Sequence, residues 1–370
     1  MTKGVVHVVG AGITGATVAR RCADAGFKVY VYEAKPTVGG LCEDTDTGIQ
    51  YYGPHIFHTD NEAVMNFLNR FTSFIPVKYI VGLITDFGNF DFPFSLEDAQ
   101  KIDSNFNVNQ FYKEYPEDLS YEDYMLAKTG EKLYHLTYKP YSERFWGCSA
   151  THLSQMLGKR VSLREPHECY HKNKYAGMPV GGFKQMIERM LDHSNISVIH
   201  KRVTASTLLS TPSLGRSKVF STAHIDEFFE YKYGELEYVR LDIKIEEETE
   251  EYHKIFTDKG IYSVCHTYNT PRSNASLCYR SSSLHRYYDN PNPCVVKEYV
   301  NNVSGLKTHP LLWGINASHP LYDDLVARMQ QYTKYANRFP NLVCCGRFGN
   351  YKYMDMDKCV EEALKITENI

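Results

Sequence analysis

The chain has 370 residues, of which 43% are hydrophobic and 23% are charged, and its formal net charge is -3. This length fits two or three domains, and this composition excludes wholesale disorder. The numbers of basic and acidic residues, 41 and 44, are nearly equal and give no indication of a nucleic-acid binder, which would need a strongly basic face. No run of about 18 apolar residues is present, so we expect no membrane span.

The ten cysteines are scattered, and only Cys344 and Cys345 are neighbours. Because there is no C-x-x-C pair, we expect neither a zinc site nor a disulfide framework. The first residues lack the long apolar core of a signal peptide. We therefore expect a cytoplasmic protein with reduced thiols.

The first 40 residues are predicted to form one βαβ unit. Val5–Val9 is a nearly continuous β-branched run, typical of a buried parallel strand. A helix over 17–25 should end at Gly26, and a second strand over 27–32 is closed by Glu33.

The segment from residue 60 to about 146 is predicted to be mostly helical. Asp60 should cap a helix over 63–71, and Ser120 with Asp123 resembles a capping box. Between these helices, residues 79–92 are predicted to form one strand.

The remaining chain is predicted to contain many strands. Helices are expected over 183–191 and 356–366. Strands are expected over 196–200, 218–222, 236–245, 260–268, 294–299 and 341–345, and those between 218 and 299 should form an antiparallel sheet. The acidic run over 226–251 is interpreted as a solvated strand-turn edge without function.

A glycine fingerprint lies between the first strand and the first helix. Its sequence is Gly10-Ala11-Gly12-Ile13-Thr14-Gly15, which matches G-x-G-x-x-G. The first glycine permits a tight turn, the second lets a pyrophosphate approach the backbone, and the third packs helix against strand. Glu33 should accept hydrogen bonds from a ribose. This context predicts dinucleotide binding, and a glycine-rich turn without a ligand is the alternative.

Two further features favour FAD over NAD. A second glycine pair, Gly39-Gly40-Leu41, follows shortly after Glu33 and resembles the FAD branch of this fold. Near the C-terminus, Cys345-Gly346-Arg347 follows a predicted strand, as in flavoproteins that return the chain to the ribityl and pyrophosphate groups.

Five motifs resemble those of the UDP-galactopyranose mutase family. The resemblance extends to divergent members of that family, such as a dTDP-fucopyranose mutase. The motifs occur in the family's order over nearly the whole chain. They are Tyr-Gly-Pro-His-Ile-Phe-His-Thr at 52–59, Tyr-Ser-Glu-Arg-Phe-Trp-Gly at 141–147, Met-Pro-Val-Gly-Gly-Phe at 178–183, Ile-Asp-Glu-Phe-Phe at 225–229, and the segment 346–357.

The element order and the resemblance together predict an α/β fold. It should contain an FAD-binding Rossmann-like domain, an inserted helical domain and an antiparallel β-sheet domain. The first should take residues 1–60, 180–220 and 335–370, the second 61–160, and the third 75–95, 161–180 and 221–334. The resemblance further implies a homodimer. The charge balance and the lack of a long apolar run predict that it binds neither nucleic acid nor a membrane.

The resemblance implies an isomerase that interconverts the pyranose and furanose forms of a nucleotide-diphosphate sugar without net redox. In this family the N5 atom of reduced FAD attacks the anomeric carbon, and a flavin–sugar adduct forms while the diphosphate is detached. The product would be a furanose, such as galactofuranose or fucofuranose, for cell-surface polysaccharide biosynthesis. No metal is implied.

Residue roles follow from matching the family's motifs. Arg160 and Arg280 are the implied phosphate-binding catalytic arginines, with Arg272 as the rival of Arg280 and a surface role as the alternative for Arg160. Catalytic roles are also implied for His58 and for Asp355 near the sugar. Tyr141 should line the nucleotide site, Trp146 the sugar pocket and Tyr353 the phosphates, with plain packing as the alternative for Tyr353. Tyr170 should stack on the base. The implied FAD contacts are Gly10, Gly12, Thr14, Gly15, Glu33, Gly39, Gly40, Leu41, His55, Ile56, Arg347, Tyr353, Asp355 and Met356.

The sequence departs from the family where the substrate binds. The family has paired tyrosines where this chain has Leu311 and Leu312, and leucine cannot hydrogen-bond phosphate. We therefore hypothesise retained chemistry with UDP-galactose, UDP-N-acetylgalactose or dTDP-fucose as substrate, since a 6-deoxy sugar suits a more apolar pocket. The alternatives are an FAD-dependent oxidoreductase of the amine-oxidase-like class and a flavin-binding remnant without turnover.

Overall fold

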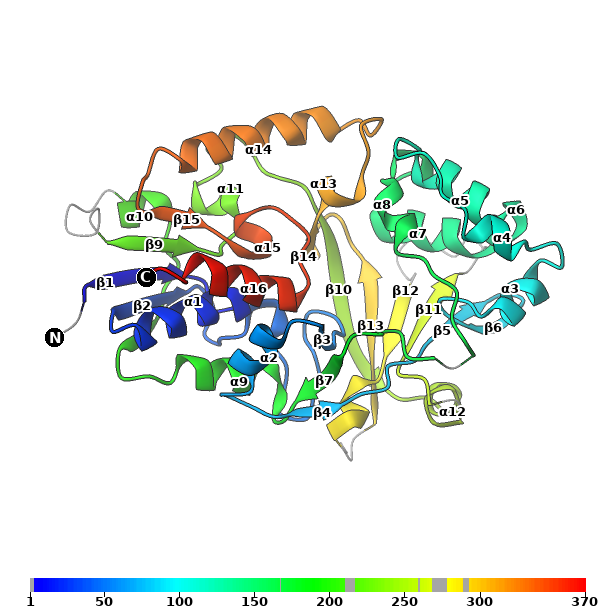
Figure 1. Ribbon diagram of the computed structural model, residues 1–370, viewed down its shortest axis with the longest axis horizontal. Coiled ribbons are helices and arrows are strands. Elements are labelled where there is room, and N and C mark those ends of the chain that lie inside the picture. The colour runs from blue at the N-terminus through cyan, green and yellow to red at the C-terminus, as the bar shows by residue number, and fades with distance from the viewer. Residues whose placement is uncertain (1–2, 167, 210–216, 259, 268–277, 289–292) are drawn as a thin grey trace. The chain divides into compact units, whose positions relative to one another are not determined.

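The computed structural model describes residues 3–166, 168–209, 217–258, 260–267, 278–288 and 293–370 (Figure 1). The chain forms two compact units, each assembled from segments that are distant in sequence. Unit 1 comprises Met1–Val77, Asn173–Glu237 and Asp324–Ile370, and unit 2 comprises Lys78–Lys172 and Tyr238–Asp323.

The predicted three-domain division stays a prediction. The interleaving of segments is present in the structure, but the helical segment and the antiparallel sheet fall within one compact unit. The rival arginine, Arg272, lies outside the described residues.

Unit 1 is built on a parallel sheet whose described strands run in the order β15-β9-β1-β2-β8. Its strands are β1 (Val5–Val9), β2 (Lys28–Glu33), β8 (Ile196–His200), β9 (Lys218–Ser221) and β15 (Leu342–Cys344). Val6, Val8, Val29 and Val31 form one face of the central strands and are at most 1% exposed. Burial of each such side chain contributes about 1.5–3 kcal/mol, so this face anchors the unit.

Helices cover this sheet. The first, α1 (Ile13–Asp24), follows β1 directly and packs against α16 (Met356–Ile366) and α9 (Gly182–Leu191) (Figure 1). The remaining elements of unit 1 are η1 (Gly40–Cys42), β3 (Phe57–Thr59), α2 (Glu62–Leu68), β4 (Phe74–Pro76), β7 (Tyr175–Pro179), α10 (Ala205–Leu209), α11 (Ile225–Phe228), α15 (Gly346–Gly349) and most of α14 (Tyr322–Ala336). Of these, β3, β7 and β4 form a small antiparallel sheet.

Unit 2 contains a second sheet with the described strand order β14-β10-β13-β12-β11-β5-β6. All its neighbouring strands are antiparallel except β11 and β5, which pair in parallel. The strands are β5 (Val81–Thr85), β6 (Gly88–Asp91), β10 (Tyr238–Glu247), β11 (Ser263–Thr267), β12 (Cys278–Ser282), β13 (Cys294–Val300) and β14 (Leu306–Pro310). The parallel and antiparallel sheets confirm the predicted fold class.

A group of helices accompanies this sheet (Figure 1). They are α3 (Leu96–Ile102), α4 (Val108–Phe111), α5 (Tyr121–Thr129), α6 (Glu131–Leu133), a π-helical turn η2 (Tyr134–Tyr138), α7 (Lys139–Trp146), η3 (Ala150–His152), α8 (Gln155–Lys159), α12 (Glu250–Asp258), η4 (Leu284–Tyr288) and α13 (Leu311–Gly314). The predicted cap of α5 is confirmed, because the Ser120 hydroxyl accepts a hydrogen bond from Asp123 N at 3.0 Å. Within the described ranges, no helix is both long and apolar enough to cross a bilayer.

Several predictions about local structure are wrong. Residues 79–92 form a hairpin, β5 and β6, because Gly88 turns the chain with φ +148° and its carbonyl accepts from the Thr85 hydroxyl at 2.7 Å. The helix α2 is capped by Asn61, whose side chain accepts from Ala63 N and Val64 N. Asp60 instead accepts from the backbone of Lys174 at 2.7 Å.

One assignment to the antiparallel sheet is also wrong, and another holds only in part. The strand over 218–222 is β9, which pairs in parallel with β1 and belongs to unit 1. Within the acidic run, β10 pairs with β14 only over its first four residues, and residues 242–247 pair with β13 alone among the described strands. Within that run, Asp226 is fully buried and accepts from Leu236 N at 2.9 Å.

The stability of unit 2 should depend on acid through a buried histidine. His266 on β11 is 1% exposed, and burial beside Arg144 and Lys297 lowers its pKa from 6.5 to about 3. Between pH 6.5 and about pH 3, the unfolded chain carries a proton on this histidine that the folded chain lacks. The free energy of unfolding is therefore unaffected by this group above about pH 6.5 and decreases by about 1.4 kcal/mol per pH unit as pH falls below it. In urea unfolding from about pH 7 to about pH 5, His266→Gln should flatten this decline. The exposed His135→Gln is the control, and an unchanged slope in His266→Gln would contradict the assignment.

Candidate active site

The glycine fingerprint forms the tight turn between β1 and α1. Gly10 has φ +97°, and its amide donates to the Tyr32 carbonyl at 2.8 Å. A Cβ on Gly15 would lie 2.0 Å from the Gly10 carbonyl oxygen, so only glycine allows the helix to pack this closely on the turn. A Cβ on Gly12 would meet nothing closer than 3.7 Å, which leaves space beside the first turn of α1. The N-terminal amides of such a helix favour a phosphate.

Glu33 holds this turn against the end of β2. Its two carboxylate oxygens accept hydrogen bonds from Ala11 N at 2.8 Å and from Lys35 N at 2.9 Å. A carboxylate offers about four acceptor positions, so both bonds are compatible with further acceptance from ribose hydroxyls.

The second glycine pair lies directly against the first glycine loop. Gly39 N donates to Ala11 O at 3.0 Å, and Gly39 and Gly12 form an isolated parallel bridge. Both Gly39 and Gly40 have positive φ, and a Cβ on Gly40 would lie 3.0 Å from the Gly12 Cα. The two loops therefore form one glycine cradle with Leu41 in the following turn, as the FAD-type interpretation requires.

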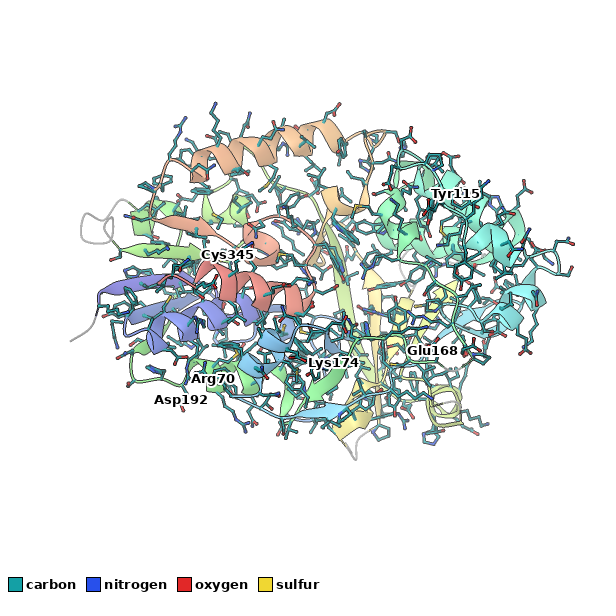
Figure 2. The ribbon with its side chains drawn as sticks, viewed as in Figure 1. Arg70, Tyr115, Glu168, Lys174, Asp192 and Cys345 are labelled. Carbon is teal, nitrogen blue, oxygen red and sulfur yellow. The ribbon has the colours of Figure 1, made fainter. Side chains whose placement is uncertain are left out.

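The segment after β15 brings the C-terminal motif to this cradle. Cys345, labelled in Figure 2, is 1% exposed and precedes Gly346, whose φ is +75°. A Cβ on Gly346 would lie 2.8 Å from the Thr14 hydroxyl. Arg347 donates through Nε to the Met354 carbonyl at 3.0 Å, and its Cζ lies 4.7 Å from the centre of the Tyr353 ring.

Glu362, which was not among the residues predicted from the sequence, fixes this segment. One of its carboxylate oxygens accepts from Gly346 N at 2.7 Å and the other from the Asn350 side chain at 2.6 Å. The residue is on α16, beyond the motif at 346–357, and no signal in the sequence marks it because its contact with Gly346 joins two helices.

The histidine-containing segment is also in unit 1. The Gln50 side chain holds the His55 backbone, accepting from its amide at 2.6 Å and donating to its carbonyl at 2.7 Å. Ile56 is 5% exposed, and His58 lies on β3.

Asp355 and Met356 lie at the start of α16, next to this strand. The carbonyl of Asp355 accepts from Cys359 N at 3.0 Å, so Asp355 occupies the N-cap position of the helix. The Thr59 hydroxyl donates to Asp357 at 3.2 Å and ties β3 to α16. Burial raises the pKa of Asp357, while Lys358 and His58 oppose the rise. Unit 1 thus gathers the predicted cofactor residues, and sequence reasoning missed Gln50 and Asp357.

Unit 2 carries the predicted nucleotide and sugar contacts. Tyr141 and Trp146 are on α7, and Trp146 is 6% exposed. The Tyr141 ring centre lies 5.6 Å from that of Phe92 and 6.2 Å from that of Tyr279. Burial raises the pKa of Tyr141 well above its usual value.

Arg280 on β12 is paired with a buried glutamate. Its Nε and one terminal nitrogen donate to the two oxygens of Glu298, the second at 3.0 Å, and the Glu298 side chain is 1% exposed. Tyr279 also donates its hydroxyl to Glu298 at 2.9 Å. The pKa of Arg280 is raised well above its usual value by Glu298, against the effect of burial, so the guanidinium is held charged.

Tyr170 connects the two predicted phosphate arginines electrostatically. Its amide donates to the Tyr79 carbonyl at 2.6 Å, and the Cζ of Arg164 lies 5.8 Å from its ring centre. Burial raises the pKa of Tyr170, and the positive charges of Arg160 and Arg280 oppose that rise. Arg160, at the C-terminal end of α8, and Arg280 therefore act on the same tyrosine.

The family follows from comparison with known proteins. A family model described as UDP-galactopyranose mutase matches residues 136–353, more than half of the chain. The chain belongs to the UDP-galactopyranose mutase family. A second model, described as an NAD(P)-binding Rossmann-like domain, matches residues 8–71.

Relatives of this chain match almost end to end. It is 28% identical to the "Probable UDP-galactopyranose mutase" of Klebsiella pneumoniae, covering 98% of this chain and 94% of that one. It is 26% identical to the dTDP-fucopyranose mutase of Escherichia coli, covering 98% and 97%. The crystal structure of reduced UDP-galactopyranose mutase has the same fold, with a TM-score of 0.69 at 14% identity over 98% of this chain and 94% of that one.

These comparisons confirm the predicted family, the fold class and the enzyme class, a sugar-nucleotide mutase. They also support a flavin-type cofactor. Within the described part of the chain, no group of three or more His, Cys, Asp or Glu side chains could hold a metal ion. The roles of individual site residues stay predictions.

Two substitutions in the glycine cradle should separate folding from cofactor binding. Gly12 has an ordinary φ of -79°, so Gly12→Ala should fold normally while its methyl group fills the space left for a phosphate. Gly15→Ala should lose about 1–3 kcal/mol of folding free energy or more, because its methyl group overlaps the Gly10 carbonyl. The measurements are the melting temperature and the flavin absorbance per protein. A Gly12→Ala protein with full flavin content would contradict the assignment.

Proposed function

We propose that this protein is a flavin-dependent mutase that interconverts the pyranose and furanose forms of a nucleotide-diphosphate sugar without net redox. The observation that carries the proposal is the cationic and aromatic cluster of unit 2, in which Arg280 is paired with the buried Glu298 and the Cζ of Arg160 lies 5.6 Å from the ring centre of Trp313. Two guanidinium groups suit a substrate whose diphosphate must be held while it is detached from the sugar. The family membership supports the same reaction.

FAD in its reduced form is the proposed cofactor. The glycine cradle around Gly12 and Gly39 would hold its pyrophosphate, and Glu33 would accept from its ribose. Arg347 and Tyr353 would contact the far part of the cofactor or the substrate phosphates. When bound and reduced, the flavin supplies the nucleophile for the anomeric carbon of the sugar.

The chain's own residues then bind, orient and shield the reacting groups. Arg160 and Arg280 stabilise the negative charge that grows on the diphosphate as the bond to the sugar breaks. Glu298 keeps the Arg280 guanidinium in one orientation, so little reorganisation is needed. Trp146 and Tyr141 shield the sugar from water, and His58 and Asp355 are assigned to proton transfer at the sugar oxygens.

The substrate is proposed to be UDP-galactose, UDP-N-acetylgalactose or dTDP-fucose. The loss of tyrosine hydroxyls at Leu311 and Leu312 favours the 6-deoxy sugar, and one relative is named as a dTDP-fucopyranose mutase. A homodimer and a cytoplasmic location are further expectations of the family resemblance and of the scattered cysteines.

A substrate comparison tests this proposal. Purified protein is reduced anaerobically and incubated with each of the three sugar nucleotides, and the products are separated by chromatography with mass detection. We expect a new peak of unchanged mass, with dTDP-fucopyranose turned over fastest. A clear preference for a UDP sugar would overturn the preference for the 6-deoxy sugar, and no new peak from any of the three would overturn the proposed function.

A further inference from the structure

The guanidinium of Arg160 lies over an indole ring that the sequence motifs do not include. The Cζ atom of Arg160 is 5.6 Å from the ring centre of Trp313, within the range of a cation–π interaction. Arg160 is exposed and directly follows α8, a helix of five residues. A short helix end by itself fixes a long side chain poorly, and the indole supplies a contact that orients it.

The orientation of Trp313 is set by a second indole. The ring centres of Trp313 and Trp146 lie 5.9 Å apart with 36° between their planes. Trp146 is buried, and its ring also contacts Phe145 at 5.2 Å. Gly314 lies directly against Trp146, since a Cβ on it would be 2.1 Å from the ring. Trp313 therefore packs against Trp146, and the residue that follows Trp313 must be glycine because Trp146 leaves no space for a Cβ there.

Hydrogen bonds to backbone carbonyls tie the segment that carries Trp313 to the helix that precedes Arg160. Ser154 N, at the N-cap of α8, donates to the Gly314 carbonyl at 2.8 Å. The Asn316 side chain donates to the Leu153 carbonyl at 2.9 Å, and Leu153 and Ile315 form an isolated antiparallel bridge. The segment 153–154 and the segment 314–316 thus form one strap, which keeps Arg160 and Trp313 in register.

We propose that Trp313 is a positioning residue that holds Arg160 ready for the diphosphate of the sugar nucleotide. An indole covers the face of a guanidinium and leaves the N–H groups around its edge available, and those groups are the ones that bind phosphate. Trp313 thereby orients the arginine without competing for its hydrogen bonds. The inference rests on the proposed function, because it takes a diphosphate as the ligand of Arg160.

A double-mutant cycle tests the inference with the holoenzyme. The probes are UDP and dTDP, whose dissociation constants are measured by calorimetry alongside KM and kcat. Trp313→Leu should weaken binding of the preferred nucleotide about twofold to thirtyfold, the range of a cation–π contact, and Trp313→Phe should weaken it less. In the Arg160→Ala background, neither change should weaken binding further.

Two results would overturn the inference. One is equal weakening by Trp313→Leu with and without Arg160, which would mean that the indole acts independently of the arginine. The other is unchanged binding in both Trp313 variants. Flavin content and melting temperature show whether the Trp313→Leu protein folds. If that protein does not fold, Trp313→Phe replaces it in the double-mutant cycle. Failure of the proposed function is distinct, because it leaves the unsubstituted enzyme without product from any sugar nucleotide.

Discussion

Replacing Arg160 by alanine should lower kcat/KM for the sugar nucleotide about a hundredfold to a thousandfold. This range corresponds to about 2.7–4 kcal/mol, the usual cost of removing one preorganised group that stabilises developing negative charge. Because Arg160 is exposed at the end of α8, its removal should leave the melting temperature and the flavin content nearly unchanged. The measurement is steady-state turnover with the preferred sugar nucleotide.

Lys159 provides a matched control for this change. It precedes Arg160, is also exposed, and pairs with Glu117 at 2.6 Å. Lys159→Ala removes the same charge one position away and should change kcat/KM by less than about threefold, since exposed ion pairs contribute little. Equal losses in the two variants would show that Arg160 acts only through the general charge of the surface.

Replacing Arg280 by alanine should unfold part of the population as well as abolish turnover. Glu298 is 1% exposed, and without Arg280 its carboxylate would be left buried with one partner, the Tyr279 hydroxyl. Breaking such a buried pair from one side costs about 3–5 kcal/mol of folding free energy. Urea unfolding of the holoenzyme measures this loss, and a stability equal to that of the unsubstituted protein would contradict the buried pairing.

A double substitution separates folding from catalysis at this position. Arg280→Ala with Glu298→Gln removes both charges, and glutamine can still accept from the Tyr279 hydroxyl. We expect most of the stability to return, because no uncompensated charge stays buried. Turnover should stay low, since the phosphate contact is missing. Full recovery of turnover would show that Arg280 serves only the fold.

Local sequence patterns predicted the parts of the molecule that depend on neighbouring residues. The βαβ unit, the cap at Ser120 and the helix over 356–366 are set by periodicity and capping chemistry, and all three are present. The hairpin over 81–91 was missed because a turn at Gly88 interrupts a run that otherwise has uniform strand character. The partner of β9 could not be predicted, since pairing depends on a strand more than 200 residues earlier in the chain.

In the candidate site too, features set by neighbouring residues were predicted and contacts between distant segments were not. The glycine cradle was predicted because each glycine has a local conformational reason to be there, whereas its contact with the second glycine pair is a tertiary feature. Glu298 was missed because its carboxylate is buried beside Arg280 on the next strand, and nothing in its own segment marks it. The contact of Trp313 with Arg160 could not be predicted, because the two residues are more than 150 positions apart in the chain and meet only in the folded unit.

We propose that the protein rearranges a sugar nucleotide without net redox. Counting the product molecules formed per reduced flavin tests this proposal most directly. This test matters because the fold alone does not decide the reaction. The flavin is reduced once, excess reductant and oxygen are removed, and product and flavin absorbance are followed together. The account predicts many furanose molecules per protein while the flavin stays reduced. Product limited to one molecule per flavin, or turnover that requires oxygen, would contradict it.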